Sequence, residues 1–332
     1  MQLIFLGTSA GVPTKERNVS GAALRCSLSG RWVLIDCGEG TQHQILHCPL
    51  SFKDLDAICI THVHGDHCYG LPGILASASM AGRKEPLKVI APKGIQEMLA
   101  ALMQYTDMYM GYDVEFIATE SLLSESLPVL FDVDCIRLSH RVPSYAYRFI
   151  EAGVPEKLDV QKLERRGIPR GPLWGQLQQQ GYVDVEGEGE RVLKKDFILP
   201  PQNPRQIIVA GDNDSPCLLA EACKYADVLV HEATYTQEIS DKVGPAPMHS
   251  SALQVAKMAD SVGLKNLVLT HFSARYRKDP QMHGVNDKLC SIKEIQDEAQ
   301  AAYSGELFLA NDLDHYELSK GRALKYLKNY GQ

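Results

Sequence analysis

The sequence predicts an α/β fold in which helices cover β-sheets, and three observations lead to that prediction. The chain has 332 residues, of which 45% are hydrophobic and 23% charged, as is usual for a globular protein with a sizeable core. Short apolar runs, each followed by polar residues and often by glycine, recur along the chain. Segments with helical patterns lie between many of these runs. Strands interleaved with helices predict layers of sheet and helix.

The expected elements follow one another along the chain. Apolar runs predict strands at 3–6, 32–35, 57–60, 87–90, 135–138, 206–210, 228–230, 267–270 and 307–309. Helical patterns cover 95–103, 216–225, 250–262 and 292–302. The third helix has apolar residues at helical spacing, and His249 or Ser250 is expected to cap its N-terminus.

Residues 151–199 interrupt this alternation. They include the stretch 167–175, Gly-Ile-Pro-Arg-Gly-Pro-Leu-Trp-Gly, in which five of nine residues are Gly or Pro. That composition hardly suits a buried helix or a central strand, because Pro removes a backbone donor and Gly adds conformational entropy that folding must overcome. With little core pattern, the segment is interpreted as an excursion from a single domain, 1–332, and not as a second domain.

Composition also indicates the environment of the protein. Nothing resembles a signal peptide and no run of about 18 apolar residues is present, so a membrane partner is not expected. The nine cysteines lack paired spacing, which predicts reduced thiols without disulfide partners in a cytoplasmic protein. The formal net charge of −7 argues against a general nucleic-acid binder. A polyanion would have to meet local positive charge or bound metal.

The strongest local signal is the run Thr-His-Val-His-Gly-Asp-His at 61–67, directly after an apolar run. In an extended segment residues two apart point the same way, so His62 and His64 can reach one metal ion together. Gly65 permits a sharp turn that places Asp66 and His67 toward a neighbouring site. Imidazole and carboxylate ligands suit zinc or a similar first-row ion, with manganese and cobalt as alternatives.

Three further candidates, His140, Asp212 and His271, each lie just past an apolar run. Each alone fits a surface polar residue equally well, but strand ends are where α/β folds build their sites. Together with the histidine run they predict a shared site for two metal ions. A carboxylate such as Asp212 can bridge two ions and leave a water or hydroxide between them as the nucleophile.

These motifs resemble the metallo-β-lactamase fold, whose signature is similar to the run at 61–67 and whose earlier motif is similar to Asp36-Cys-Gly-Glu-Gly-Thr-Gln. The resemblance implies a four-layer αββα sandwich with two zinc ions at one sheet edge. It assigns His62, His64 and His140 to one ion, Asp66, His67 and His271 to the other, and Asp212 to both. Asp36 would support a ligand without binding metal itself.

Five further stretches resemble the ribonuclease Z family of tRNA 3′-processing endonucleases. They are Pro-Thr-Lys-Glu-Arg-Asn at 13–18, Gly-Ile-Pro-Arg-Gly-Pro at 167–172, His-Glu-Ala-Thr at 231–234, His-Ser-Ser at 249–251 and His-Phe-Ser-Ala-Arg-Tyr at 271–276. One departure is Gly-Asp-Asn-Asp at 211–214, where the family often has Gly-Asp-Thr-Arg. The matches span most of the chain.

The family resemblance implies that the chain removes the 3′ trailer from precursor tRNA and leaves a 3′-hydroxyl on the tRNA and a 5′-phosphate on the trailer. A hydroxide bound by both metals would attack phosphorus, Asp66 would accept its proton, and His249, oriented by Glu232, would protonate the departing oxygen. The segment 151–199 would be a flexible, protruding arm that binds tRNA, with its tip at 167–175, in a homodimer. The implied RNA contacts are Lys15, Arg17, Asn18, Gly171, Pro172 and Arg275.

Two other functions compete with this interpretation. One is a different hydrolase of the same fold, such as a phosphodiesterase acting on a small molecule. The other is an RNA-binding protein whose metal ions are only structural, which a complete ligand set together with His249 disfavours.

Overall fold

The computed structural model describes residues 1–153, 156–184, 191–199, 203–278 and 290–331. The chain divides into two compact units. The larger unit comprises Met1–Ile150 and Arg205–Gln332, and the smaller unit comprises Glu151–Pro204. The smaller unit is therefore an insertion into the larger one, and each is described by itself.

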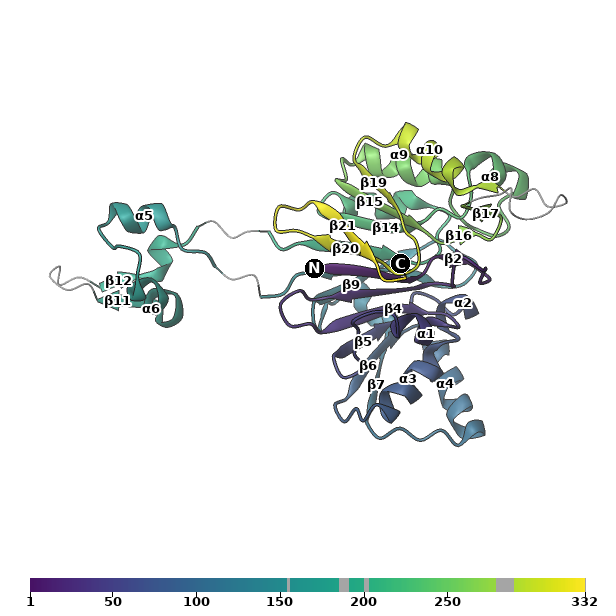
Figure 1. Cartoon of the computed structure of the whole chain (residues 1–332), viewed down its shortest axis with the longest axis horizontal. Coiled ribbons are helices and arrows are strands. Elements are labelled where there is room, and N and C mark those ends of the chain that lie inside the picture. The colour runs from purple at the N-terminus through teal and green to yellow at the C-terminus, as the bar shows by residue number, and fades with distance from the viewer. Residues whose placement is uncertain (154–155, 185–190, 200–202, 279–289, 332) are drawn as a thin grey trace. The chain divides into compact units, whose positions relative to one another are not determined.

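Two sheets form the centre of the larger unit (Figure 1). The first has the strand order β21-β20-β1-β3-β4-β5-β6-β7, and the second the order β19-β15-β14-β13-β10-β9-β8. The first sheet consists of β1 Gln2–Gly7, β3 Gly21–Arg25, β4 Trp32–Cys37, β5 Leu55–Cys59, β6 Leu87–Ala91, β7 Val114–Ala118, β20 Asp314–Leu318 and β21 Leu324–Asn329. The second consists of β8 Leu127–Pro128, β9 Asp132–Leu138, β10 Ser144–Ile150, β13 Gln206–Ala210, β14 Val228–Glu232, β15 Asn266–Thr270 and β19 Glu306–Leu309.

The two sheets pack face to face, and helices cover their outer faces. Along β1, Leu3 and Phe5 belong to the core between the sheets, whereas Ile4 and Leu6 belong to the core on the outer side. Strands with two buried faces lack polar alternation, which is why they read as continuous apolar runs. The helices are α1 Thr41–Ile45, α2 Gly65–Cys68, α3 Leu71–Met80, α4 Lys93–Thr106, α7 Ala220–Cys223, α8 Gln237–Val243, α9 Ala252–Ser261 and α10 Ile292–Ala302.

Helices α3 and α4 lie against the first sheet, and α9 and α10 lie against the second (Figure 1). This confirms the expected four-layer αββα sandwich. All nine predicted strands are present, while β3, β7, β8, β10, β20 and β21 were not predicted. The helix expected at 216–225 begins as a 3₁₀ turn, Pro216–Leu219, before α7.

The N-terminus of α9 corrects one prediction, because its cap is neither His249 nor Ser250. The Ser251 hydroxyl accepts a hydrogen bond from the Gln254 N–H at 3.2 Å, and the Gln254 side chain accepts one from the Ser251 N–H at 3.0 Å. This reciprocal pair is a capping box. His249 is thus free of a capping role.

Substitution of Ser251 tests whether this residue caps the N-terminus of α9. We expect Ser251→Ala to lower the free energy of unfolding by about 1 kcal/mol, because an N–H at the helix start loses its acceptor. Urea denaturation followed by circular dichroism measures the change, with Ser261→Ala at the other end of α9 as the control. Equal stability of the two variants would contradict the capping role.

The smaller unit has a core of its own, which the sequence pattern did not reveal. Its buried side chains come from α5 Val160–Arg165, α6 Pro172–Gln180, β11 Tyr182–Asp184, β12 Arg191–Leu193 and the 3₁₀ turn Lys194–Phe197. Two residues of the stretch 167–175 take part in this small folded unit. Pro172 opens helix α6, a position that needs no backbone donor. Trp174 is partly buried against the small core, and its indole N–H donates to the Ile168 carbonyl at 3.1 Å.

Candidate metal centre

The predicted ligands converge at one edge of the sandwich because of strand direction. Strands β13, β14 and β15 are parallel, and β9 runs the same way, since both β9 and β13 are antiparallel to β10. Asp212, His271 and His140 follow the carboxyl ends of β13, β15 and β9. His62 and His64 follow β5 in the facing sheet. The chain topology thus assembles residues that lie up to about two hundred positions apart.

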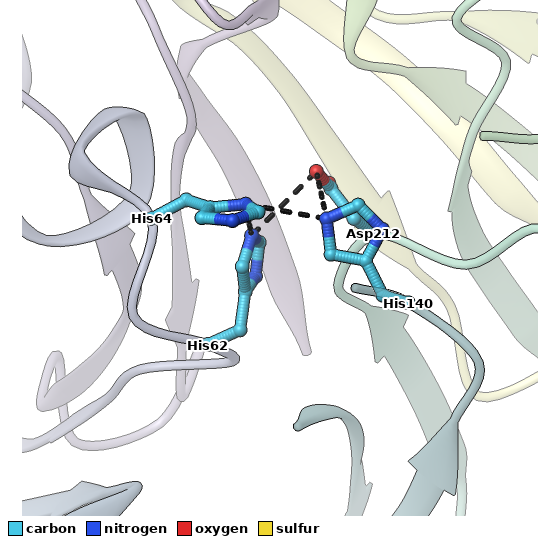
Figure 2. Close-up of side chains that lie close together, drawn as sticks. All are labelled: His62, His64, His140 and Asp212. Carbon is cyan, nitrogen blue, oxygen red and sulfur yellow. Dashed lines mark hydrogen bonds and ion pairs between the residues drawn. The ribbon is translucent and has the colours of Figure 1, made fainter. Parts of the chain in front are cut away.

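The first cluster consists of His62, His64, His140 and Asp212 (Figure 2). His64 Nδ1 lies 3.1 Å from His62 Nε2 and 3.2 Å from His140 Nε2. Asp212 Oδ2 lies 3.6 Å from His62 Nε2 and 3.7 Å from His140 Nε2. The four side chains point at a common centre, as Figure 2 shows.

The second cluster consists of Asp66, His67 and His271, and it shares Asp212 with the first. The Nε2 atoms of His67 and His271 lie 3.3 Å apart, and each lies 3.5 Å from Asp66 Oδ2. Asp212 Oδ1 lies 3.3 Å from His67 Nε2 and 3.4 Å from His271 Nε2. One oxygen of Asp212 therefore faces each cluster, which is the geometry of a bridging carboxylate.

Hydrogen bonds on the far side of two of the rings are those of metal-binding histidines, whose neutral form has its lone pair on the converging nitrogen. His140 Nδ1 donates to the Met248 carbonyl at 3.0 Å, and His67 Nδ1 donates to Asp36 Oδ2 at 2.7 Å. A carbonyl or a carboxylate only accepts, so these contacts fix the proton on Nδ1 and leave Nε2 as a ligand. Lone pairs and carboxylate oxygens directed at one another repel unless a cation lies between them. The residues fit a divalent metal site.

Two similar relays hold histidines in this orientation. The Thr61 hydroxyl donates to Asp36 Oδ2 at 2.8 Å and lies 3.0 Å from His62 Nδ1, from which it accepts. The Thr234 hydroxyl donates to Glu232 and lies 3.1 Å from His271 Nδ1. A buried carboxylate thus orients a ligand through a threonine in both halves of the site. Such supporting contacts commonly change metal affinity about 10- to 100-fold when they are removed.

The backbone is strained where it presents these groups. Asp36, His271 and Met248 have φ values of 56°, 57° and 56°, in the left-handed region that residues other than glycine seldom adopt. Their side chains or carbonyl groups support or supply metal ligands. Strain of this kind persists only where the surrounding structure enforces it, and it is concentrated at functional sites.

Gly38, from the motif at 36–42, permits a close approach of two chain segments. A Cβ atom at this position would lie 2.3 Å from the Asp66 carbonyl oxygen. No side chain fits at that distance. The glycine therefore lets α2, which carries Asp66 and His67, pack directly on the end of β4.

Burial favours the neutral form of three of the clustered histidines, which is the form that binds a metal ion. Burial lowers the pKa of His62, His64 and His140, and neighbouring histidines add to this effect. Burial raises the pKa of Asp212, but His271, His67 and His62 outweigh it and hold that pKa well below the usual range. His67 differs from these three histidines, because burial lowers its pKa but Asp212, Asp36 and Asp66 outweigh burial and raise that pKa well above the usual range. A metal ion that binds this ring would therefore displace a proton from it.

His249 and Glu232 form a pair beside the two clusters. His249 Nδ1 lies 3.0 Å from Glu232 Oε2 and 3.8 Å from Asp212 Oδ2. Burial lowers the pKa of His249, but the buried Glu232 carboxylate outweighs it and raises the pKa to about 9. The imidazole is therefore held as a cation at neutral pH, ready to donate a proton next to the metal site.

One expected RNA contact is contradicted by the structure. The Arg17 guanidinium is buried, where it donates to the Thr8 hydroxyl at 2.6 Å and to the Ala310 carbonyl at 2.8 Å. It also lies 4.9 Å above the Phe272 ring. Arg17 therefore anchors the 13–18 loop and does not face solvent.

The other expected contacts lie at or near the surface. Lys15, Gly171 and Pro172 are exposed, while Asn18 is half-buried. Arg275 is half-buried, with its guanidinium 5.2 Å from the Tyr235 ring centre. In the motif at 211–214, which departs from the common family sequence, Asp214 Oδ1 accepts a hydrogen bond from the Ser215 hydroxyl at 2.8 Å.

Comparison with known proteins now places the chain. A family model described as anti-Pycsar protein Apyc1 matches residues 1–123. Ribonuclease Z of Pseudomonas putida strain W619 is 49% identical over 324 residues, which cover 98% of this chain and 98% of that protein. Ribonuclease Z of Marinobacter nauticus is 47% identical over 320 residues, which cover 96% and 97%. The chain belongs to the ribonuclease Z family.

Solved structures agree with this membership. The short form of human tRNase Z is 26% identical with a TM-score of 0.61, and the match covers 96% of this chain and 100% of that chain. The metallo-β-lactamase fold protein YhfI of Bacillus subtilis, at 18% identity and a TM-score of 0.59, supports the fold alone. The metallo-β-lactamase fold is confirmed. No helix in the described parts of the chain is long and apolar enough to cross a bilayer, and no disulfide is found among the described residues.

Some residues at the site of this ribonuclease Z family member have no role that could be expected from the sequence alone. The Gly11 N–H donates to Asp66 Oδ2 at 2.8 Å, and Thr234 links Glu232 to His271. Tyr69 and Arg141 line the pocket of about 320 Å³ that opens onto the metal clusters. Tyr69 lies two residues after His67 and Arg141 directly follows His140, and this proximity in the sequence was the signal that could have identified them.

Proposed function

We propose that this chain is a zinc-dependent endoribonuclease that removes the 3′ trailer from precursor tRNA by phosphodiester hydrolysis. The tRNA would keep a 3′-hydroxyl and the trailer a 5′-phosphate. The observation that carries the proposal is the pair of clusters joined by Asp212 beside the His249–Glu232 pair, in a chain close to half identical to ribonuclease Z proteins.

The site residues divide the chemistry among them. When bound at the two clusters, divalent cations neutralise charge on the phosphodiester oxygens and activate a water near neutral pH. Asp66 accepts the proton of the attacking water; its Oδ2 is held by the Gly11 N–H. His249 donates a proton to the departing 3′-oxygen, and Glu232 keeps it protonated and oriented.

Two zinc ions per subunit agree with the donor set. Five imidazoles and two carboxylates divide into one cluster of three histidines and one of two histidines and an aspartate, both completed by Asp212. Nitrogen-rich sites of this kind suit zinc, and manganese or cobalt would bind similar ligands.

RNA binding by a chain of net charge −7 depends on where its cations lie. Lys15 and Arg275, from segments that approach the site, are proposed to contact the acceptor end, with Asn18 beside them. The smaller unit, Glu151–Pro204, is proposed to bind the body of the tRNA, with contacts at Gly171 and Pro172. Recognition would follow backbone and shape.

We also propose a cytoplasmic homodimer, in which the smaller unit of one subunit holds RNA that the other cuts. The exposed apolar side chains of Met80, Tyr105 and Tyr109 support an interface at the ends of α3 and α4. The Gly111 N–H donates to the Ser79 hydroxyl at 2.9 Å and so joins these two ends. Nine cysteines without a disulfide among the described residues agree with a reducing compartment.

Deletion of the smaller unit tests the proposed substrate. Strands β10 and β13 pair with Ile150 opposite Gln206, so residues 151–205 can be replaced by an Asn-Gly turn that closes the hairpin. We expect cleavage of precursor tRNA to fall at least about 100-fold, because phosphate contacts outside the metal site are lost. Hydrolysis of bis(p-nitrophenyl) phosphate, which needs only the metal site, should persist.

Circular dichroism and metal content of the deletion variant serve as controls for folding. Unchanged cleavage of precursor tRNA would refute the role of this unit. If the wild-type protein also failed to cleave precursor tRNA, the result would instead favour a phosphodiesterase that acts on small substrates.

A further inference from the structure

The mouth of the metal pocket carries three side chains that the proposed chemistry does not use, Glu39, Tyr69 and Arg141. They line a pocket of about 320 Å³ together with four residues of the metal clusters, His64, Asp66, Asp212 and His271, and with Gly11, Gly65 and His249. We propose that Arg141 and Tyr69 form a clamp for one nucleotide next to the scissile phosphate. In this clamp the guanidinium binds the neighbouring phosphate and the phenol ring stacks on the base. The inference rests on the proposed endoribonuclease function and adds two substrate-binding residues to it.

Arg141 is placed and charged to bind a phosphate. It directly follows His140 and is exposed, and its charge acts on His64 of the first cluster. Within the described ranges of the chain, no hydrogen-bond or ion-pair partner is found for its guanidinium. An arginine kept free at the mouth of a metal site offers a planar pair of donors that matches phosphate oxygens.

Tyr69 supplies an aromatic surface on the other chain segment that lines the pocket. It is the C-cap of α2, the short helix that carries Asp66 and His67, and its N–H donates to the Gly65 carbonyl at 2.8 Å. The ring lies against Gly65, where a Cβ atom would be 2.1 Å from a ring carbon, so any other residue would displace it. Nevertheless 66% of the side chain is exposed. An exposed aromatic ring beside the metal clusters suits base stacking.

The charges around the pocket fix the side on which RNA enters. Outside the metal clusters, the lining residues include one anion, Glu39, and two cations, Arg141 and the protonated His249. A polyanion is repelled from Glu39 and attracted to Arg141. The nucleotide next to the scissile bond is therefore expected to lie on the Arg141 side, with its base over Tyr69.

Single substitutions in the full-length metal-loaded protein test the clamp on precursor tRNA. Arg141→Gln is expected to lower kcat/KM about 10- to 100-fold, since a charge-assisted hydrogen bond is lost, and Arg141→Lys should recover part of it. Tyr69→Ala is expected to lower kcat/KM about 5- to 100-fold, whereas Tyr69→Phe keeps the stacking surface and stays near wild type. The matched controls are Arg137→Gln, an exposed arginine on β9, and Tyr225→Ala, which is 63% exposed.

Modified substrates identify the contacted groups. An abasic nucleotide is placed first on the 5′ side and then on the 3′ side of the cleavage point. At one of these two positions it should abolish the difference in kcat/KM between Tyr69→Ala and wild type. A neutral methylphosphonate at the adjacent phosphate should likewise abolish the effect of Arg141→Gln. Differences that survive all of these substitutions overturn the clamp.

The controls separate the clamp from the proposed function. Metal content and hydrolysis of bis(p-nitrophenyl) phosphate by Arg141→Gln should match wild type, because that substrate has no neighbouring phosphate. If wild-type protein cleaves precursor tRNA and the two variants behave like their matched controls, the clamp alone is wrong. If wild-type protein hydrolyses the small ester but leaves precursor tRNA intact, both the clamp and the proposed function are wrong.

Discussion

Replacement of Asp212 by alanine is expected to empty both metal positions and to lower kcat/KM for precursor tRNA by about 10³-fold or more, since charge neutralisation and water activation are lost together. One carboxylate oxygen lies 3.6–3.7 Å from His62 and His140, and the other lies 3.3–3.4 Å from His67 and His271. The substitution therefore removes a ligand from each cluster, which no other single substitution among the seven ligands does. Elemental analysis of purified protein measures the metal content directly.

A neighbouring carboxylate provides the control for this experiment. Asp214 lies two residues further on, outside both clusters, and accepts from the Ser215 hydroxyl. Asp214→Ala should retain about two ions per chain and near-wild-type cleavage. An Asp212→Ala protein that still carries its full metal content, or still cleaves precursor tRNA, would rule out the bridging assignment.

The residues proposed as metal ligands could be picked out from the sequence because the signal is local. A histidine or aspartate that follows an apolar run marks a strand end, and parallel strands bring their carboxyl ends to one edge. His62, His64, His140, Asp212 and His271 satisfy this pattern without any knowledge of the sheet order. The four-layer fold followed from the family resemblance, whereas the alternation of strands and helices predicted only the α/β class.

The contacts that the sequence did not reveal join residues far apart in the chain. Arg17 lies in a loop whose residue pattern suits RNA binding, but its guanidinium is turned inward by the Ala310 carbonyl, 293 positions away.

The core of the smaller unit was missed because it gathers single side chains, such as Leu163, Leu177 and Val192, from very short elements. Such elements carry too few residues for a periodic signal.

The proton-donor role of His249 leads to the second prediction. We expect His249→Ala to lower kcat about 10²- to 10⁴-fold, with KM and metal content little changed, because general acid catalysis is lost while the ligands stay in place. His249 lies 3.0 Å from Glu232 and 3.8 Å from the nearer oxygen of Asp212. Single-turnover cleavage with saturating protein separates this loss from any change in RNA binding.

The pH dependence distinguishes a proton donor from a residue that only shapes the pocket. Glu232 outweighs burial and raises the pKa of His249 to about 9, so the donor is protonated at neutral pH and loses its proton as the pH rises through that pKa. The wild-type rate should therefore fall on the alkaline side. Glu232→Gln removes the charge that raises the pKa, so its alkaline limb should move to lower pH, and His249→Ala should lack that limb.

Glu232 also orients His271 through Thr234, so Glu232→Gln combines two effects that a second variant can separate. Thr234→Val breaks the link to His271 and leaves the His249–Glu232 contact in place. It should weaken metal binding without a shift of the alkaline limb. If Thr234→Val shifted the limb as much as Glu232→Gln, the limb would report metal loss, and His249 would not be the donor.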